Sequence, residues 1–371
     1  MLTNKRGYNL RFGRAIMAFA LAASLSAVVG STNPASAAPD VCELTEEELT
    51  VYDLPAGSSV IQCDAVGRVV TYDGTGVTVP SPGTAVSVDS ITADGESHGF
   101  MMEVDTNGIV SYDLTEAESA DSSVAGSDAA DSLTPTTTTG DVTLEADNAE
   151  ADASDSSEGA EVAEVDAAAS PGACSDGTYA TKGLKEYGTY NWYIGDGGLP
   201  AGMSHDDAIW VFYDAVAAIA ESYNNCGYSD QVDMNYPNYM AKTSFEADIN
   251  TSSQCTDRDG LSTWDGGNLK DDVYATTCTW SWPAPGVKND LREADVRFNT
   301  HDFDFTNKVT SSCSNKVDVR SVGTHEAGHV FGLKDIYGSH GNLTMYGYSI
   351  ECSTRARTLG KGDVLGLRSI Y

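Results

Sequence analysis

The stretch Thr324-His325-Glu326-Ala327-Gly328-His329-Val330-Phe331-Gly332-Leu333-Lys334-Asp335 decides the fold of the C-terminal part of the chain. Residues four apart share one face of a helix, so His325 and His329 can direct two imidazoles at one point. Glu326 lies on the same turn, where its carboxylate can reach a water molecule on a metal held by that pair. Two nitrogen ligands beside a carboxylate base form the HExxH arrangement, which predicts a zinc site on this helix.

The residues after His329 predict a third ligand. A glycine at position 332 can adopt a positive φ, end the helix and turn the chain back under the metal. Asp335 is then placed to supply an oxygen ligand, which leaves a fourth position open for water. His340 is the alternative third ligand, because imidazole suits zinc and the residue lies in a glycine-flanked loop. Its position relative to Gly332 favours Asp335.

The pattern HExxHxxGxx followed by a third ligand resembles the metzincin clan of zinc peptidases, which carry a methionine turn downstream of the ligands. Leu343-Thr344-Met345-Tyr346-Gly347 lies at a suitable distance for that turn. The resemblance implies that Met345 forms an apolar floor beneath the ligands. The last residues, 363–371, are similar to the closing helix of the matrixins, with an Asp, a Gly three positions on and a terminal Ile-Tyr.

One position departs from the usual metzincin pattern. Metzincins usually have His where this chain has Asp335. An Asp in that place, followed closely by Tyr337, is similar to the snapalysin group of small secreted bacterial neutral proteases. The resemblance covers about residues 172–371 and is strongest over residues 321–347.

The resemblance implies an α+β zinc peptidase domain with a mixed five-stranded sheet and long helices. Zinc would be the cofactor and Glu326 the general base that hydrolyses peptide bonds of extracellular proteins. The strand at residues 293–299, with Val296 and Phe298 on one face, would form the edge of the cleft and pair with an extended protein or peptide substrate. The alternatives are a secreted adhesion or binding module with a structural zinc, or a metal hydrolase of non-peptide amides.

Residues 1–37 are a predicted secretory signal peptide. An apolar run from position 15 to 30 precedes Ala35-Ser36-Ala37, an AxA-type cleavage site. Four basic residues precede the run: Lys5, Arg6, Arg11 and Arg14. The run is short for a membrane span, and no other stretch is long and apolar enough to be one. We therefore expect an extracellular bacterial protein that is not inserted in a membrane.

Eight cysteines follow the signal peptide, and an even number in an exported chain predicts disulfides. Sequence alone does not determine connectivity, but two cysteines lie in the N-terminal part and six in the C-terminal part, so each part can pair its own. The pairing that we expect is Cys42–Cys63, Cys174–Cys226, Cys255–Cys278 and Cys313–Cys352. The last pair would tie the start of the zinc helix to the segment after Met345.

The chain is strongly acidic, with a net charge of −34, which argues against nucleic acid or an anionic membrane as a partner. Residues 38–115 contain short alternating apolar runs and predict a small β-rich domain. That domain is either a prosegment that keeps a zymogen latent or an accessory folding module. Residues 116–171 are rich in Asp and Glu and too poor in apolar residues to fold, which predicts a linker extended by self-repulsion.

Residues 172–371 form the predicted catalytic domain, which we expect to be a monomer. A strand at residues 190–194 precedes a helix that begins at Ser204, with Asp207 at the third position of a capping box. Residues 255–272 hold several aspartates among glycines, so they could bind Ca²⁺, although the spacing does not match an EF-hand and a polar loop is the alternative. These aspartates are Asp257, Asp259, Asp265, Asp271 and Asp272.

Overall fold

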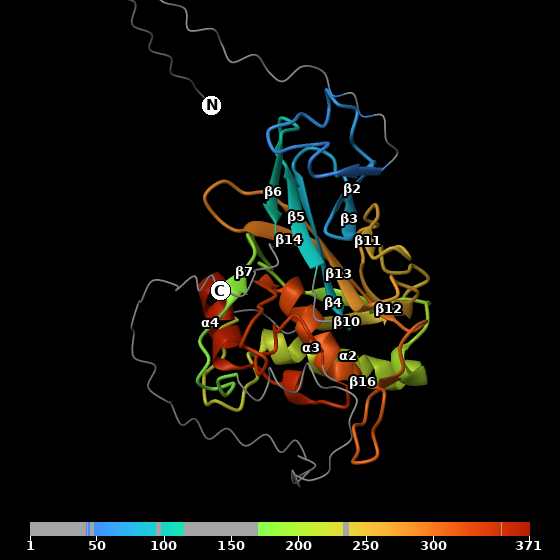
Figure 1. The fold of residues 1–371 in the computed structure, drawn as a ribbon, viewed down its shortest axis with the longest axis vertical. Coiled ribbons are helices and arrows are strands. Elements are labelled where there is room, and N and C mark those ends of the chain that lie inside the picture. The colour runs from blue at the N-terminus through green and yellow to red at the C-terminus, as the bar shows by residue number, and fades with distance from the viewer. Residues whose placement is uncertain are drawn as a thin grey trace, which may run out of the picture. The chain divides into compact units, whose positions relative to one another are not determined.

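A computed structural model describes residues 42, 44, 48–93, 98–114, 170–232, 237–349 and 351–371. The predicted signal peptide and nearly all of the predicted linker lie outside these ranges. Within them the fold is mixed α and β, with several sheets and few helices (Figure 1). No helix in the described ranges is long and apolar enough to cross a membrane.

Five strands of the C-terminal part form one continuous stretch of the largest sheet. In spatial order they are β10 (Asn238–Lys242), β9 (Asn191–Ile194), β12 (Ser262–Gly267), β14 (Asn289–Asn299) and β13 (Val273–Trp282). Neighbouring strands run parallel except β13, which is antiparallel to β14. This part of the sheet is mixed, as expected.

The sheet has nine strands rather than the expected five, because three strands of the N-terminal part continue it past β13 and the short β8 (Leu184–Lys185) pairs with β14. β4 (Thr84–Thr92) pairs antiparallel with β13, and β5 (His98–Val104) and β6 (Val110–Leu114) follow it (Figure 1). Residues 85–92 are buried along their whole length, so β4 joins as an internal strand. The sequence did not predict an internal strand here, because several residues of this segment are polar.

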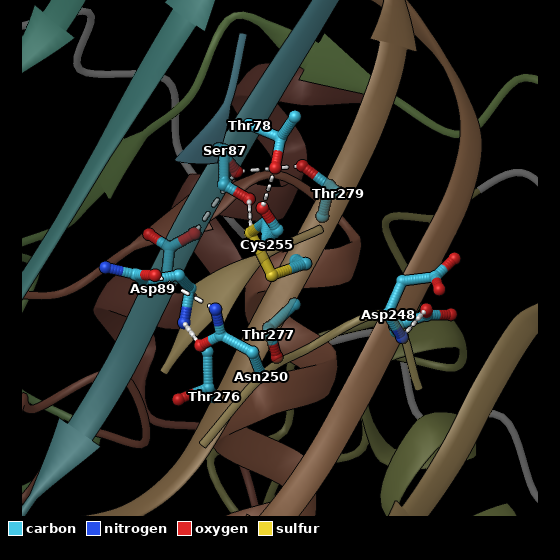
Figure 2. Close-up of a disulfide and its surroundings, with 12 residues drawn as sticks. Thr78, Ser87, Asp89, Asp248, Asn250, Cys255, Thr276, Thr277 and Thr279 are labelled. Atoms are coloured by element: carbon cyan, nitrogen blue, oxygen red, sulfur yellow. Dashed lines mark hydrogen bonds between the residues drawn. A yellow bond between two sulfur atoms is a disulfide. The ribbon is translucent and has the colours of Figure 1, made fainter. Parts of the chain in front are cut away.

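The two faces of β4 have different neighbours. Val86 and Val88 pack into an apolar cluster that includes Trp280 of β13. On the opposite face the Ser87 hydroxyl lies 2.8 Å from that of Thr279, and Figure 2 shows this pair where β4 lies beside β13. Successive residues of a strand point to opposite faces, so the alternation in this segment separates an apolar side from a polar one.

Two helices pack together and against the five-stranded part. α2 (His205–Ala220) begins as predicted, since the Ser204 hydroxyl accepts a hydrogen bond from the backbone N–H of Asp207 at 3.1 Å. α3 (Val319–Val330) carries the HExxH motif. In the core between them and the sheet, the rings of Phe212 and Phe298 stack with centroids 5.4 Å apart. α4 (Lys361–Ile370) lies where a closing helix was expected.

The remaining elements are short. They are β1 (Glu48–Thr50), β2 (Val69–Tyr72), β3 (Thr75–Thr78), β7 (Ala180–Thr181), β8 (Leu184–Lys185), η1 (Pro200–Gly202), β11 (Gln254–Cys255), β15 (Phe305–Thr306), β16 (Val317–Asp318), β17 (Leu333–Lys334) and η2 (Arg355–Arg357). β2, β3, β4 and β5 overlap the alternating runs from which the β-rich N-terminal part was predicted.

The cysteines form the four disulfides expected from the sequence: Cys42–Cys63, Cys174–Cys226, Cys255–Cys278 and Cys313–Cys352. One disulfide lies within residues 42–63 and the other three within residues 174–352. No disulfide therefore crosses between the N-terminal and C-terminal parts, although strands of both parts share one sheet.

The prediction that the strand at residues 293–299 forms the edge of the cleft is wrong. β14 lies between β12 and β13, and Val296 and Phe298 are completely buried. β13 stands outside β14 and carries β4 on its other side. Both strands are therefore internal in this sheet, and their alternation could not show it, because only pairing with segments distant in sequence decides which strands are internal.

We predict that Phe298→Ala lowers the free energy of unfolding by about 3–5 kcal/mol, because it removes a fully buried ring that packs against Phe212 and Trp264. Chemical denaturation with the disulfides intact measures the loss. Val287→Ala is the matched control, since this side chain is 64% exposed and its truncation should change stability by less than about 0.5 kcal/mol. Equal losses in the two variants would contradict the described core.

Candidate metal centre

The end of α3 brings the third predicted ligand back towards the first two. Gly332 has φ +92°, and a Cβ at this position would lie 2.6 Å from the carbonyl oxygen of Leu184. Only glycine meets both conditions without strain. The chain then runs through β17 to Asp335, which lies beside the helix that it has just left. Gly332 thus lies just past the end of α3, at the turn where the sequence placed it.

Three ligand-type atoms converge at this point. The Nε2 atoms of His325 and His329 lie 3.1 Å apart. Oδ1 of Asp335 lies 3.0 Å from Nε2 of His325 and 3.5 Å from Nε2 of His329. All three residues are buried, with exposed fractions of 1%, 0% and 6%. The two histidines and the aspartate predicted from the sequence are therefore brought together.

Backbone carbonyls orient both imidazoles. Nδ1 of His325 lies 2.9 Å from the carbonyl oxygen of Thr344, and Nδ1 of His329 lies 3.1 Å from that of Leu333. A carbonyl only accepts, so each Nδ1 carries the proton and donates it, and each Nε2 of a neutral ring is left with its lone pair. The two lone pairs face one another and the carboxylate oxygen of Asp335.

This donor set fits a zinc ion. Three electron-rich atoms at these spacings repel one another unless a cation or a proton lies between them. Tetrahedral zinc with bonds of about 2.0–2.1 Å separates its ligand atoms by about 3.3 Å, close to the spacings of this group. Two imidazoles and one carboxylate also form a known type of three-ligand set in catalytic zinc sites, which leaves one position for water.

Electrostatics differ between the two carboxylates of the centre. Burial alone would raise the pKa of Asp335, but the adjacent imidazoles of His329 and His325 hold that pKa well below its ordinary value. Burial raises the pKa of Glu326 to about 8, although His325 and a hydrogen bond from Thr277 act in the opposite direction. Asp335 is thus ionised, as a carboxylate ligand of a metal must be. The pKa of Glu326 lies near neutral pH, where a carboxylate can both accept and release a proton.

Glu326 has one oxygen held and one available. The Thr277 hydroxyl of β13 donates to Oε2 of Glu326. Oε1 is buried and has no hydrogen-bond partner among the described residues. A buried carboxylate oxygen without a partner, one residue from a histidine of the converging group, is the arrangement that a base acting on a water molecule would need. The sequence contained no sign of the Thr277 contact.

Met345, for which the resemblance to metzincins implies a place beneath the ligands, packs against α3. It is buried, and a Cβ on Gly328 of α3 would lie 2.2 Å from its sulfur atom, so the glycine lets the methionine approach the helix. The Asp363 carboxylate of α4 accepts hydrogen bonds from the backbone N–H groups of Thr344 and Met345 at 2.9 and 3.1 Å. Because the carbonyl of Thr344 holds the His325 ring, Asp363 supports that ligand through one stretch of backbone.

His340, the alternative third ligand, lies apart from this group. Its Nδ1 is 2.8 Å from Oδ2 of Asp176. The aspartates proposed for Ca²⁺ are not brought together either. Asp265 pairs with the Arg297 guanidinium at 2.7 Å, and none of the five belongs to a metal-capable group of three in the part of the chain that the structure describes.

A second group of carboxylates was not predicted from the sequence. Asp248, Glu293 and Asp295 approach one another closely enough to hold a cation. Their oxygens, however, already accept hydrogen bonds from backbone N–H groups and from Arg258. Burial raises the pKa of Asp248 to about 7 and that of Asp295 well above its ordinary value. We assign this group to the packing of the sheet.

Asp89 of β4 reaches the metal centre from the N-terminal part of the chain, which the sequence did not indicate. Its Oδ1 lies 3.8 Å from Nδ1 of His329. Its other oxygen pairs with the ammonium group of Lys182, and both side chains are buried. Ile91, two residues further along β4, lines a cavity of about 10 Å³ beside His325. That space is far below the roughly 300 Å³ of a small-molecule site.

Comparison of the chain with protein-family models and with curated proteins finds no match. The geometry of the centre is therefore what indicates a function. That geometry is a buried triad of two imidazoles and a carboxylate on a helix and the turn that follows it, with a second carboxylate adjacent.

Loss of an outer hydrogen-bonding partner lowers the metal affinity of a site by about 10- to 100-fold. We predict that Asp335→Ala, which removes a ligand itself, lowers the Zn²⁺ affinity by more than that. His340→Ala should leave Zn²⁺ affinity unchanged, because its imidazole faces Asp176 instead. Competition with a fluorescent zinc chelator measures both affinities in the full chain, and circular dichroism confirms that each variant is folded. The reverse order of effects would assign the third ligand to His340.

Proposed function

We propose that the chain is a secreted zinc-dependent endopeptidase that resembles the metzincins, and within them the matrixin and snapalysin groups. The observation that carries the proposal is the position of Glu326. Its unpartnered Oε1 is buried beside the converging ligand atoms of His325, His329 and Asp335. A structural zinc site needs no such base, whereas hydrolysis does.

The proposed reaction divides the work among few residues. Zinc, when bound, supplies a water molecule of lowered pKa and polarises the scissile carbonyl. Glu326 accepts the proton that the water loses and returns it to the leaving amine. The Thr277 hydroxyl holds Oε2, so the carboxylate presents Oε1 in a fixed direction. His325 and His329 keep their orientation through the backbone carbonyls that their Nδ1 atoms contact.

The substrates in this proposal are extracellular proteins and peptides. A peptide in extended form adds to the free side of a strand through backbone hydrogen bonds, with little demand on its sequence. Export is supported by the predicted signal peptide and by four disulfides, which persist in oxidising compartments.

We predict that Glu326→Ala lowers the rate of casein hydrolysis by about 10²- to 10⁴-fold, the usual contribution of a general base. For this assay a protease recognition sequence is inserted within residues 116–169. The chain is cut there and its N-terminal part is removed. Casein is then added to the remaining C-terminal part. Glu351→Ala, which alters an exposed loop carboxylate, is the matched control and should keep full activity. A chelator should abolish hydrolysis and added Zn²⁺ should restore it.

The alternative outcomes of that experiment are distinct. Zinc binding at one site with no turnover in the cut chain would favour a binding module with a structural metal. Turnover of small amides but not of casein would favour a non-peptide hydrolase. Full activity in Glu326→Ala would contradict the proposed base.

We predict a rate profile that rises from about pH 6 to pH 8 and holds into mildly alkaline solution. Burial raises the pKa of Glu326 to about 8, and only its ionised form accepts a proton, so the rate falls as the pH drops below that pKa. Asp335 in place of a neutral imidazole also lowers the positive charge of the centre, which raises the pKa of the bound water. Casein hydrolysis measured across this range tests the profile, and a maximum at acid pH would contradict it.

A further inference from the structure

The outer edge of β13 is already occupied along its length. β4 pairs with it in antiparallel register from Ala85 opposite Ser281 to Thr92 opposite Val273. Without β4, β13 would be the outermost of the five strands of the C-terminal part. Its unpaired N–H and C=O groups would then be able to accept an extended peptide, as exposed strand edges commonly do.

This edge lies directly beside the proposed catalytic group. Thr277 of β13 donates a hydrogen bond to Glu326, and its partner across the strand pair is Asp89. Two residues further along, Ile91 lies opposite Ala275 and lines the small cavity next to His325. Asp89 and Ile91 share the face of β4 that points to α3, because successive residues of a strand alternate between faces. β4 thus crosses the metal centre in extended form.

The centre is closed to a substrate in this arrangement. Glu326 and His329 are completely buried, and His325 is 1% exposed. The cavity beside His325 has about 10 Å³ of space. A peptide needs an open cleft, so a chain in this arrangement cannot position a scissile bond at Glu326.

We propose that residues 84–92 are an intramolecular inhibitor that occupies the substrate-binding edge of the proposed peptidase. β4 takes the place of an extended substrate along β13, and Asp89 and Ile91 take the places of substrate side chains at the metal centre. This inference rests on the proposed function and names how the same site is regulated. The N-terminal part of the chain then keeps the centre latent until β4 is removed.

The contacts that hold β4 in place are non-covalent. No disulfide joins residues 42–63 to residues 174–352. Asp89 forms a buried ion pair with Lys182, and Asp113 of β6 forms a second pair with Lys334 at 2.6 Å. Residues 115–169 provide the covalent connection between the two parts, which keeps the local concentration of β4 high. Cleavage anywhere within those residues removes that advantage, because the N-terminal part can then dissociate and be diluted.

The test uses the full chain with a protease recognition sequence inserted within residues 116–169. Hydrolysis of fluorescent casein is measured before the cut, after the cut, and after the N-terminal part has been removed by ion exchange. We expect the rate to rise at least ten-fold on removal. Returning the separated N-terminal part should lower the rate again by raising the KM for casein while leaving kcat unchanged, as competition for one edge requires.

Asp89→Asn tests the contact that anchors β4. It removes the charge that pairs with Lys182, so the uncut variant should hydrolyse casein several-fold faster than the uncut parent chain. Asp53→Asn, an exposed carboxylate of the same part of the chain, is the matched control and should not change the rate. After the N-terminal part has been removed, the Asp89→Asn variant and its parent are identical proteins and must give the same rate.

A second readout separates this inference from the proposed function. A zinc-binding peptide hydroxamate should bind the separated C-terminal part at least ten-fold more tightly than the uncut chain. Such binding without casein hydrolysis would support the inference that β4 blocks the metal centre and would contradict the proposed peptidase activity. Equal casein hydrolysis by the uncut and separated forms would retain the peptidase and overturn the inhibitor. Loss of activity on removal of the N-terminal part would also overturn it, since β4 would then be a permanent part of the working site.

Discussion

The convergence of three electron-rich atoms in a buried place is the constraint on which the rest of the structure depends. His325 and His329 approach each other with lone pairs directed inward, and Asp335 adds a negative oxygen to them. Such a group is unfavourable without a cation, so the surrounding fold must hold it together. Gly332 turns the chain, two carbonyls orient the rings, and Asp363 fastens the backbone that carries one of those carbonyls. Each of these features would support a metal ion held by the three residues.

The sheet links this centre to the N-terminal part of the chain. Thr277 lies between the two, since its side chain contacts Glu326 and its backbone pairs with β4. An internal strand therefore lies where an enzyme of this proposed class needs an open edge. The apolar face of β4 packs in a cluster with residues of both parts of the chain, Trp280 of β13 among them, while Ser87 and Asp89 place polar groups on the opposite face. No disulfide crosses between the two parts, so a segment in this place can be held and later released; Figure 2 shows Ser87 and Asp89 on the polar face of β4.

The parts of the site that are close in sequence could be predicted from it, and the parts that depend on pairing could not. The spacing of His325 and His329 follows from helix geometry, and the conformational freedom of Gly332 allows the turn that returns Asp335. The distribution of cysteines between two parts of the chain accounts for Cys42–Cys63, whereas the six C-terminal cysteines allow several pairings, and the expected one is the one observed. The internal position of β14 was missed, because β13 and β14 alternate in the same way and strand order is decided by partners that are distant in sequence. The approach of Asp89 was missed for the same reason, since nothing in residues 84–92 indicates what they pair with.

X-ray absorption at the zinc edge of the purified, zinc-loaded full chain tests the central claim most directly. The account predicts one zinc ion per chain with two imidazole nitrogens and carboxylate or water oxygens at about 2.0–2.1 Å. The imidazole contribution to the spectrum should fall by half in His329→Ala. A chain that binds no stoichiometric zinc, or a spectrum without imidazole ligands, would contradict the account.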